Sequence, residues 1–406
     1  MRQPPAVAPK VAPKATPTVA LVGVHGHGRW HAQRIAELER AGRLRLTAVA
    51  DPHPPEPGTI PDGVARHATL DDLLAAAPPD ITLIATPTPT HFALAEAALR
   101  AGSDVLLEKP PVTGLAELAA LRTTAAETGR IVQVGFQSLG SAALPALRTL
   151  IADGTIGEVT GIGAAGAWCR PETYWQRAPW AGKRWMNGVP ALDGALTNPF
   201  AHVVVTALAV LGKDAMTQVP ERTQLELFHA NPVEADDTSA VRIELPGAPP
   251  IVVAVSVCAP KASEIDPWVR VQGTEGEAVF HYTAGQLTVS RSTSGVSTGV
   301  EELSKTELNK TFPEADLLAN LLDHRERPDE VPLMVPLEDT VGFTAVLEAM
   351  RDAPEPRAIP GEYVSFEHSK VGRARTLAGV VELVQACARD RLLFSEAGAP
   401  WALPDH

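Results

Sequence analysis

Short apolar runs alternate with amphipathic stretches along the first third of the chain. The first run, TVALVG, begins at residue 18, and four further runs of the same kind are RLTAVAD (45–51), DITLIATP (80–87), DVLLEKP (104–110) and RIVQVGF (130–136). Between them lie stretches with helical periodicity, such as THFALAEAALRAG and GLAELAALRTTAAETG. Apolar strands that alternate with amphipathic helices are typical of a parallel sheet covered on both faces. The pattern therefore predicts an α/β domain with a doubly wound parallel sheet over residues 18–137.

The pattern changes after residue 137. From residue 223 onward, strand-like runs follow one another without helices between them, among them TQLELFHA, TSAVRIEL and PIVVAVSVCA. Such a series predicts a large, open and mostly antiparallel sheet, so we expect a second domain of α+β type over residues 138–351. The proline-rich residues 1–17 contain no continuous apolar run, and we interpret them as a disordered leader. We expect residues 352–406 to form a C-terminal extension with one further helix.

Composition narrows the classes of partner. The chain has 406 residues and a net charge of −13, which argues against nucleic acid and against an anionic membrane surface. No apolar run is long enough to span a bilayer. Cys169, Cys258 and Cys387 are far apart and lack metal-ligand spacing, as expected for reduced thiols in the cytoplasm. An open antiparallel sheet needs its bare face buried, so we expect a homodimer or homotetramer.

A glycine-rich turn follows the first apolar run, in VALVGVHGHGRWHA. A turn between the first strand and the first helix is the place where a glycine pattern indicates dinucleotide binding. We read the pattern as Gly23-x-His25-x-x-Gly28, with histidine at the place of the second glycine, where it either displaces the phosphate or contacts it. The alternative register starts at Gly26, and a further alternative is a turn that binds no nucleotide. The candidate cofactor residues of this turn are Gly23, His25, Gly26, His27 and Gly28.

Asp51 ends the second apolar run, roughly 20 residues after the turn, at the spacing typical of dinucleotide-binding domains. A carboxylate there accepts hydrogen bonds from a ribose diol and repels a 2′-phosphate. This favours NAD over NADP as the cofactor. The alternative is a structural role, in which Asp51 caps the chain before Pro52.

The fourth apolar run ends abruptly in charge, in LLEKPPVTG (106–114). Glu108 and Lys109 follow the run directly, and the two prolines after them cannot extend a strand. A strand that ends in this way either meets water or presents its lysine to a ligand, because ligands of doubly wound sheets bind beyond the carboxyl ends of the strands.

Three features of the chain together resemble the glucose-fructose oxidoreductase / inositol dehydrogenase (Gfo/Idh/MocA) family. They are the turn with Gly23 and Gly28, the segment IATPTPTHFALAEAALRAGSDVLLEKP, and the change to an antiparallel domain. The likeness covers roughly residues 18 to 350, and Glu-Lys-Pro is its most specific part. It implies an N-terminal Rossmann domain that binds NAD, a C-terminal open-sheet domain, and a sugar or cyclitol substrate between the two.

The resemblance implies that Lys109 is the active-site lysine. Its ammonium would stabilise the alkoxide that precedes hydride loss, and Glu108 would orient it. The alternative is a solvated surface pair. His91 also matches the family pattern, and we interpret it as a helix-start residue near the cofactor. The cofactor contacts that we expect outside the glycine-rich turn and Asp51 are Thr86, Pro87, Glu108 and Lys109.

The acid/base group departs from the family pattern, which has Asp, three residues and then His. In GVPALDGALTNPFAHVVV, Asp193 matches the aspartate, but Thr197 stands where the histidine is expected and cannot take a proton at neutral pH. His202 is the nearest substitute. We expect Asn198-Pro199 to begin a helix, whose dipole would keep His202 neutral, as a general base requires. The alternatives are a core histidine at position 202 and a capping Asn198.

The segment WCRPETYWQRAPWAGKRW (168–185) holds four of the seven tryptophans and a local charge balance of +3. Aromatic rings stack on the C–H faces of sugars, and a guanidinium clamps an anionic group. We infer a binding wall for a sugar, including a sugar with an anionic group. The alternative is an oligomer interface, which also favours Trp and Arg. The candidate substrate-binding residues are Tyr174, Trp175, Trp180, Arg184 and Asn198.

These features favour an NAD-dependent oxidoreductase that acts on a secondary alcohol of a sugar or sugar-like substrate, with Lys109, His202 and Asp193 as its catalytic residues and no metal. An alternative is an NAD-dependent glycosidase, which oxidises its substrate transiently, eliminates the aglycone, adds water and returns the hydride. A third possibility is a sensor that binds NAD and sugar without catalysis.

Overall fold

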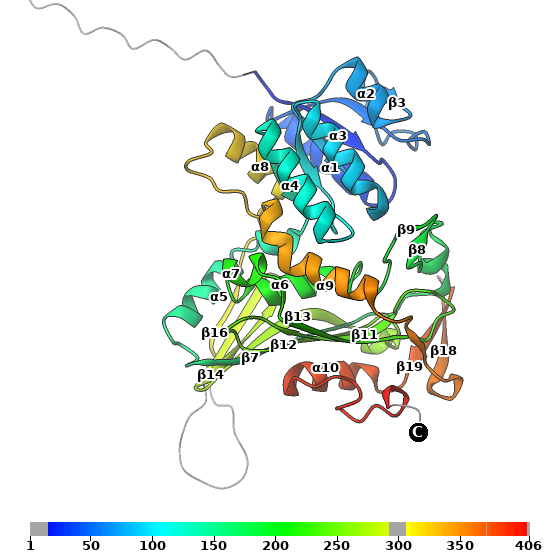
Figure 1. Ribbon diagram of the computed structural model, residues 1–406, viewed down its shortest axis with the longest axis vertical. Coiled ribbons are helices and arrows are strands. Elements are labelled where there is room, and N and C mark those ends of the chain that lie inside the picture. The colour runs from blue at the N-terminus through cyan, green and yellow to red at the C-terminus, as the bar shows by residue number, and fades with distance from the viewer. Residues whose placement is uncertain (1–14, 292–305, 371, 404–406) are drawn as a thin grey trace, which may run out of the picture.

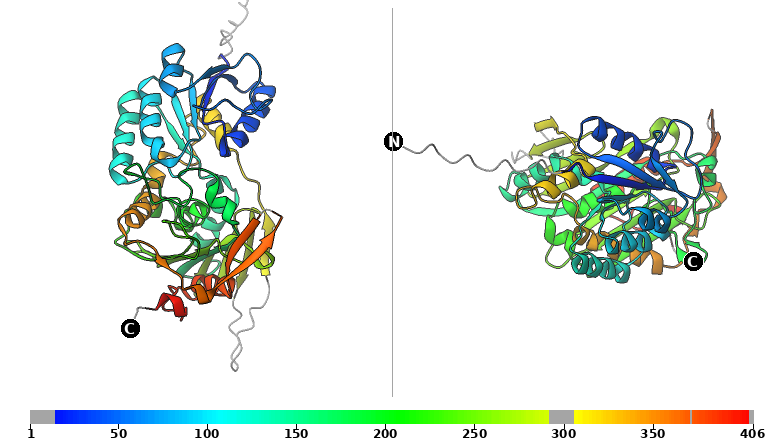
Figure 2. Two further views of the ribbon diagram at one scale, coloured as in Figure 1. Left: turned by 90° about the vertical axis from the view of Figure 1, so that its right-hand side faces the viewer. Right: turned by 90° about the horizontal axis from the view of Figure 1, so that it is seen from above.

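The computed structural model describes residues 15–291, 306–370 and 372–403. Of the proposed leader, residues 1–14 lie outside the described part of the chain. The described residues form two domains, one above the other in Figure 1, and Figure 2 shows them from the side and from above. No described helix has the length and apolar composition that a membrane crossing requires. All three cysteines are free, and the cytoplasmic location that we expected from them stays a prediction.

The upper domain is built on six parallel strands in the order β3-β2-β1-β4-β5-β6. Strands β1, β4 and β5 are almost completely buried, as their apolar sequences predict. The strand order reverses between β1 and β4, and this reversal is where doubly wound sheets bind their ligands. The strands are β1 (Thr18–Val22), β2 (Arg45–Ala50), β3 (Ala65–His67), β4 (Ile81–Ile84), β5 (Asp104–Leu107) and β6 (Val132–Val134), and the helices are α1 (His27–Arg40), α2 (Leu70–Ala76), α3 (His91–Arg100) and α4 (Leu115–Thr128).

The lower domain is built on nine strands in the order β16-β15-β14-β13-β7-β12-β11-β10-β17. The sheet is mostly antiparallel, with parallel pairing only of β7 with β12 and of β10 with β17 among the described residues. Both predicted fold classes are therefore confirmed. The strands are β7 (Val159–Ala167), β10 (Arg222–His229), β11 (Thr238–Glu244), β12 (Ile251–Ser256), β13 (Ile265–Gly273), β14 (Gly276–His281), β15 (Gln286–Arg291), β16 (Thr306–Thr311) and β17 (Arg357–Ala358).

Helices lie on both faces of this large sheet (Figure 1). The face toward the upper domain carries α6 (Ala201–Ala209) and α9 (Val341–Asp352), with α5 (Ala143–Ala152) and α7 (Lys213–Thr217) toward one end. The opposite face carries α10 (Val380–Asp390), the helix predicted for the C-terminal extension. Its residues Val384 and Cys387 belong to the same buried apolar cluster as Ala165 and Ala254 of the sheet. A Cβ on Gly163 would lie 1.7 Å from the Ala388 carbonyl oxygen, so only glycine allows this close approach.

The chain itself thus covers the middle of the sheet face that we expected a second subunit to cover, over β7, β12 and β13. The expectation of a homodimer or homotetramer stays a prediction. The extension also forms a hairpin that the sequence did not reveal, from β18 (Val364–Ser369) and β19 (Gly372–Leu377).

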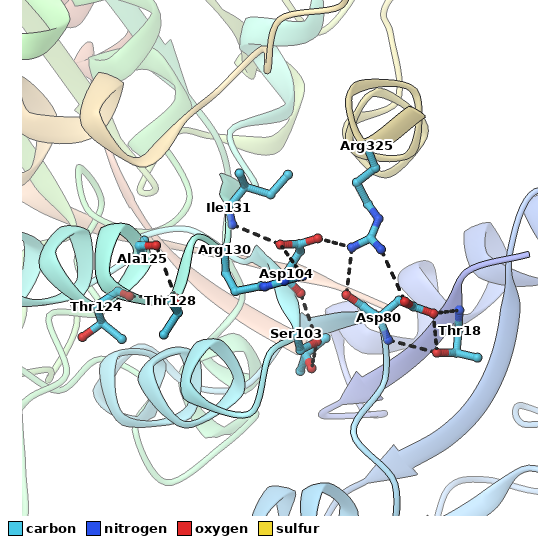
Figure 3. Close-up of polar contacts among 11 residues, drawn as sticks. Thr18, Asp80, Ser103, Asp104, Thr124, Ala125, Thr128, Arg130, Ile131 and Arg325 are labelled. Carbon is cyan, nitrogen blue, oxygen red and sulfur yellow. Dashed lines mark hydrogen bonds and ion pairs between the residues drawn. The ribbon is translucent and has the colours of Figure 1, made fainter. Parts of the chain in front are cut away.

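Helix α8 (Leu317–Glu326) returns from the second half of the chain to the upper domain (Figure 3). Arg325 donates to the Asp80 carbonyl oxygen at 3.0 Å and pairs with the Asp104 carboxylate. The Asp80 carboxylate in turn accepts from the Thr18 backbone N–H at 2.8 Å. A second ion pair joins Arg34 of α1 to Asp316 at 2.8 Å. These pairs attach α8 to the upper domain.

Candidate active site

Lys109 lies directly beyond the end of β5 and reaches across to the lower domain. Its Nζ donates to the Oδ1 atom of Asn198 at 2.8 Å and to the Asn198 carbonyl oxygen at 2.9 Å. The Lys109–Pro110 peptide bond is cis. Burial lowers the pKa of the Lys109 ammonium, while the nearby charges of Glu108 and Asp193 oppose this change. The lysine that the sequence singled out therefore faces a residue of the other domain, not bulk solvent.

His91 fixes the backbone on which Lys109 stands. Its Nδ1 lies 2.6 Å from the Pro110 carbonyl oxygen and its Nε2 lies 2.8 Å from the Thr86 carbonyl oxygen. The imidazole is fully buried and ties the end of β4 to the turn after β5. This position agrees with its interpretation as a helix-start residue. Thr86 itself bonds through its hydroxyl to Thr90 at 2.7 Å.

Asn198 connects Lys109 to Asp193. Its Nδ2 donates to Oδ1 of Asp193 at 2.5 Å. The same carboxylate accepts two bonds of 2.7 Å from Nη2 of Arg177 and one of 2.7 Å from the Gly182 backbone N–H. Asp193 is only 3% exposed, and donors occupy both of its oxygens. A carboxylate held in this way orients Asn198 and is poorly placed to accept a proton from a substrate.

The structure gives Thr197 a structural role. Its hydroxyl donates to the Leu192 carbonyl oxygen and accepts from the Gly194 backbone N–H at 3.0 Å, which closes the turn before Asn198. The spacing of the family pattern recurs five residues later, from Asn198 to His202, with asparagine in place of aspartate. Counting from Asn198 as well as from Asp193 would have found this pair in the sequence.

His202 lies on the second residue of α6, close to Lys109. Helix α6 begins at Ala201 after an N-cap at Phe200, so the predicted cap at Asn198 is wrong, because the Asn198 side chain bonds to Lys109 and Asp193 instead. Nδ1 of His202 lies 3.3 Å from Oγ of Ser138. Burial and the charge of Lys109 lower the pKa of His202 to about 3. The imidazole is therefore neutral at physiological pH.

The glycine-rich turn has the geometry that the first of the two registers requires. A Cβ on Gly28 would lie 2.0 Å from the Gly23 carbonyl oxygen, and a Cβ on Gly23 would lie 2.6 Å from the Ala85 carbonyl oxygen. Gly23 also has a φ of +85°, which favours glycine. The start of α1 therefore packs directly on the turn and directs the positive end of its helix dipole toward it. Both residues fit the pyrophosphate of a dinucleotide.

Asp51 contacts this turn from the end of β2. Its carboxylate accepts from the Val24 backbone N–H at 2.9 Å and from the His53 backbone N–H at 2.9 Å. Nε2 of His25 lies 3.9 Å from the same carboxylate. Asp51 thus has a structural role, as the alternative proposed, and it lies at the end of β2, where dinucleotide-binding domains carry an acidic residue.

Glu108 turns toward α1 and away from the Lys109 ammonium that we expected it to orient. Its Oε1 lies 2.8 Å from Nε2 of His31 and 3.4 Å from Nε2 of His27, and Gln137 donates to it at 3.2 Å. Burial raises the pKa of the Glu108 carboxyl, but the hydrogen bonds and charges of the two histidines outweigh it and hold this pKa well below its usual range. Sequence reasoning missed His31, which no local signal marked as the partner of a residue so far along the chain.

The two histidines and Glu108 also have the spacing of metal ligands. Their donor atoms all lie within 4.8 Å of one another, the sole such group among the described residues. Oε1 of Glu108 already has His31 as its partner, and His27 stands at the positively polarised start of α1, which disfavours a cation. We therefore keep these residues with the cofactor turn.

The aromatic and basic segment forms a wall beside Asp193. The guanidinium of Arg177 lies 3.8 Å from the ring centre of Tyr174 and 4.6 Å from that of Trp180. Burial and the charge of Asp193 raise the pKa of the Tyr174 phenol. Tyr174 lies in a short 3-10 helix, η3 (Glu172–Gln176). Trp175 packs inward against Gly182, so Tyr174 and Trp180 are the better candidates for sugar stacking.

Arg184 does not belong to this wall. It is buried, and its guanidinium donates to carbonyl oxygens at the end of α9. The acceptors are Met350 at 2.9 Å, Arg351 at 3.2 Å, Ala353 at 2.8 Å and Pro354 at 3.0 Å. Arg184, which we predicted as a substrate contact, thus caps the C-terminus of α9. The N–H groups that bond to these carbonyl oxygens are not free to bind a ligand.

Two family models match the chain. The model described as an oxidoreductase family with an NAD-binding Rossmann fold matches residues 18–136, and the Gfo/Idh/MocA C-terminal domain matches residues 145–279. The inositol 2-dehydrogenase of Rhizobium meliloti is 34% identical over 140 residues, which are 34% of this chain and 42% of that protein. The UDP-N-acetylglucosamine 3-dehydrogenase of Acidithiobacillus ferrooxidans is 34% identical over 117 residues, 28% of this chain and 35% of that protein. The chain thus aligns with less than half of the length of these relatives.

Solved structures share the whole fold. The WlbA dehydrogenase of Bordetella pertussis, in complex with NADH and UDP-GlcNAcA, superimposes with a TM-score of 0.63 at 19% identity, over 84% of this chain and 98% of that one. The domain order, the NAD-binding turn and the open sheet agree with both family models. The chain therefore belongs to the Gfo/Idh/MocA family of oxidoreductases, with an NAD-binding Rossmann domain at its N-terminus.

Proposed function

We propose that this protein is an NAD-dependent oxidoreductase that moves a hydride between the nicotinamide and a secondary alcohol of a sugar or sugar-like substrate. The observation that carries the proposal is the contact of Lys109, at the end of β5, with Asn198 beside the neutral His202. Relatives named as dehydrogenases of inositol and of a UDP-sugar support a polyol or sugar as the substrate. The position of Asp51 supports NAD over NADP.

Each residue has one task in this proposal. Bound NAD supplies the hydride acceptor. Nε2 of His202 takes the hydroxyl proton, which requires that Nδ1 carry its hydrogen and donate it to Ser138. Oγ of Ser138 has two lone pairs, and it accepts one bond from Thr206 at 2.9 Å, so a second bond from His202 fits. Lys109 stabilises the alkoxide, and Asn198 holds the ammonium in place.

We do not carry the glycosidase alternative further. Its motive was the missing histidine at Thr197, and the spacing from Asn198 to His202 supplies a histidine next to Lys109. The sensor alternative has no observation in its favour, because a histidine with a strongly lowered pKa beside a buried lysine is typical of a catalytic site.

The substitution Lys109→Ala tests the proposal. It should reduce turnover by at least about a thousandfold, because the alkoxide loses its cation. Binding of NADH, measured by the change in its fluorescence, should stay within a factor of about two, since the glycine-rich turn is untouched. Lys261→Ala is the matched control, because Lys261 is exposed and pairs with Glu264 on the surface. Turnover that survives in Lys109→Ala contradicts the assignment.

A further inference from the structure

The C-terminal hairpin pairs with the wall segment that carries Tyr174. Pro171 and Ala374 form an antiparallel bridge, so the register places Arg170 opposite Arg375 and Glu172 opposite Arg373. In Figure 1 the hairpin of β18 and β19 stands at the edge of the large sheet, below the short strands β8 (Trp185–Met186) and β9 (Val189–Pro190). The extension thus contributes residues to a surface that begins in the lower domain.

The four residues around this bridge carry an excess of positive charge. Residues on either side of a bridged pair point to the same face of a ladder, so three arginines and one glutamate meet there. Glu172 accepts from Arg373 at 2.9 and 3.1 Å and lies 3.8 Å from Nε of Arg375. Arg170 has no carboxylate partner among the described residues. Like charges directly opposite each other on a ladder are destabilising, and an anion would relieve this repulsion.

Two of these guanidinium groups also have unused hydrogen-bond donors. Arg170 lies with its guanidinium 4.7 Å from the ring centre of Trp168 and 5.5 Å from that of Tyr174, and its bond to the Cys169 carbonyl oxygen is long at 3.4 Å. Nε of Arg375 is buried without a hydrogen-bond partner in the part of the chain that the structure describes. The Arg375 side chain as a whole is 26% exposed, so a ligand can reach its guanidinium at an atom other than the buried Nε. Forked donors of this kind match a carboxylate or a phosphate.

Contacts through Tyr174 connect Arg170 to Lys109, the residue that we propose to act on the reacting alcohol. Arg170 lies near one part of the Tyr174 ring, and Arg177 packs over the same ring at 3.8 Å. Arg177 holds Asp193, which bonds to Asn198, the partner of Lys109. Arg170 and Lys109 thus stand at the two ends of one series of side-chain contacts, with Tyr174 between them.

We propose that Arg170 and Arg375 form a subsite for an anionic group, a carboxylate or a phosphate, borne by the substrate. This subsite rests on the proposed oxidoreductase function. It adds that the C-terminal extension, through Arg375, determines which substrates bind. Arg373 completes the subsite by neutralising Glu172, which would otherwise repel the anion.

Equilibrium binding to the NADH-loaded protein tests the subsite. The probes are D-glucose, D-glucuronate and D-glucose 6-phosphate, which differ in charge and in the kind of anion, with calorimetry as the measurement. At least one of the two anionic sugars should bind at least tenfold more tightly than glucose. In Arg170→Gln and in Arg375→Gln this preference should fall to less than threefold. Preference for glucuronate identifies a carboxylate, and preference for the phosphate ester identifies a phosphoryl group.

Arg389→Gln is the matched control, because Arg389 is exposed on α10 and pairs with Asp390. It removes the same charge and should leave the preference unchanged. Arg375→Lys guards against misfolding, since it keeps the charge and should keep part of the preference, with an unchanged melting temperature. Equal binding of all three sugars by the wild type, or an unchanged preference in Arg170→Gln, overturns the subsite. Failure to bind NADH would instead contradict the proposed function.

Discussion

The surroundings of His202 make the stability of the folded protein depend on pH. Its pKa is about 3 in the folded chain and has an ordinary value of 6.5. A histidine whose pKa is lowered only in the folded state binds a proton more readily in the unfolded state. Its contribution to the free energy of unfolding is therefore complete above pH 6.5 and is lost as the pH falls from 6.5 toward 3. Each pH unit in that window costs at most about 1.4 kcal/mol from this group.

The pH dependence of unfolding tests this assignment. Between pH 6.5 and 4, the free energy of unfolding of the wild type should fall more steeply than that of His202→Gln, which has no proton to gain. Urea titrations at several pH values give both slopes, and the comparison of slopes cancels any difference that is independent of pH. Parallel slopes would mean that His202 is solvated and has an ordinary pKa.

A substitution of Asp193 tests whether this residue orients Asn198 or takes the substrate proton. Asp193→Asn removes the charge that Arg177 and Asn198 share, so we expect a loss of about 1–3 kcal/mol in stability. Turnover should fall about tenfold, because Asn198 loses its orientation while His202 still takes the proton. Kinetics and urea unfolding measure the two effects. A loss of turnover as large as that of Lys109→Ala would make Asp193 the base.

At the scale of single residues, sequence reasoning succeeded where chemistry is local and failed where partners are distant. Lys109 was recognisable because a charged pair and two prolines end an apolar run. The role of Arg184 was not, because nothing near position 184 reveals that the open carbonyl oxygens of α9 lie beside it. The sequence predicted Asp193 in the site, and the structure brings its carboxylate to Asn198, but its contact with Arg177 depends on how the wall segment folds back.

The turn between β1 and α1 is the element on which we expect cofactor binding to depend. In Gly28→Ala the added Cβ would meet the Gly23 carbonyl oxygen at 2.0 Å, so the start of α1 must move off the turn. We expect the dissociation constant for NADH to rise at least tenfold and stability to fall by about 1–3 kcal/mol.

The control for this substitution is Gly361→Ala. Gly361 has no atom within 4 Å of an added Cβ and no positive φ, so neither NADH binding nor stability should change by a measurable amount. Fluorescence titration with NADH and thermal unfolding report the two quantities. NADH affinity that is equal in Gly28→Ala and the wild type would show that the cofactor does not use this turn.

Among the elements, those with a strong apolar period were predictable and those held by distant contacts were not. Strands β1, β4 and β5 follow the apolar runs closely because their burial on both faces demands apolar residues throughout. The hairpin of β18 and β19 has polar residues along both strands and depends on its contacts with Pro171 and Glu172. Those contacts join segments about half the chain apart, and no local pattern encodes them.

At the scale of the whole molecule, the C-terminal extension covers part of the large sheet that would otherwise be exposed. Helix α10 covers the face of β7 and β12 opposite the upper domain, with α10 at the far end of the molecule in Figure 2. A sheet of this size exposes a large apolar surface without such a cover, and exposed surfaces of that kind associate. The extension therefore covers the middle strands of the sheet on this face.

Val384→Asp tests this role of α10. Val384 is fully buried between α10 and the sheet, so a carboxylate there should detach the helix and expose the alanine-rich face. Glu382→Gln is the control on the same helix, at a solvent-facing position. We expect the aspartate variant to bind an apolar dye and to form larger species in sedimentation velocity, with the control equal to the wild type. If Val384→Asp sediments as the wild type does and binds no dye, the sheet face has a second cover, and a partner subunit on that face becomes the better account.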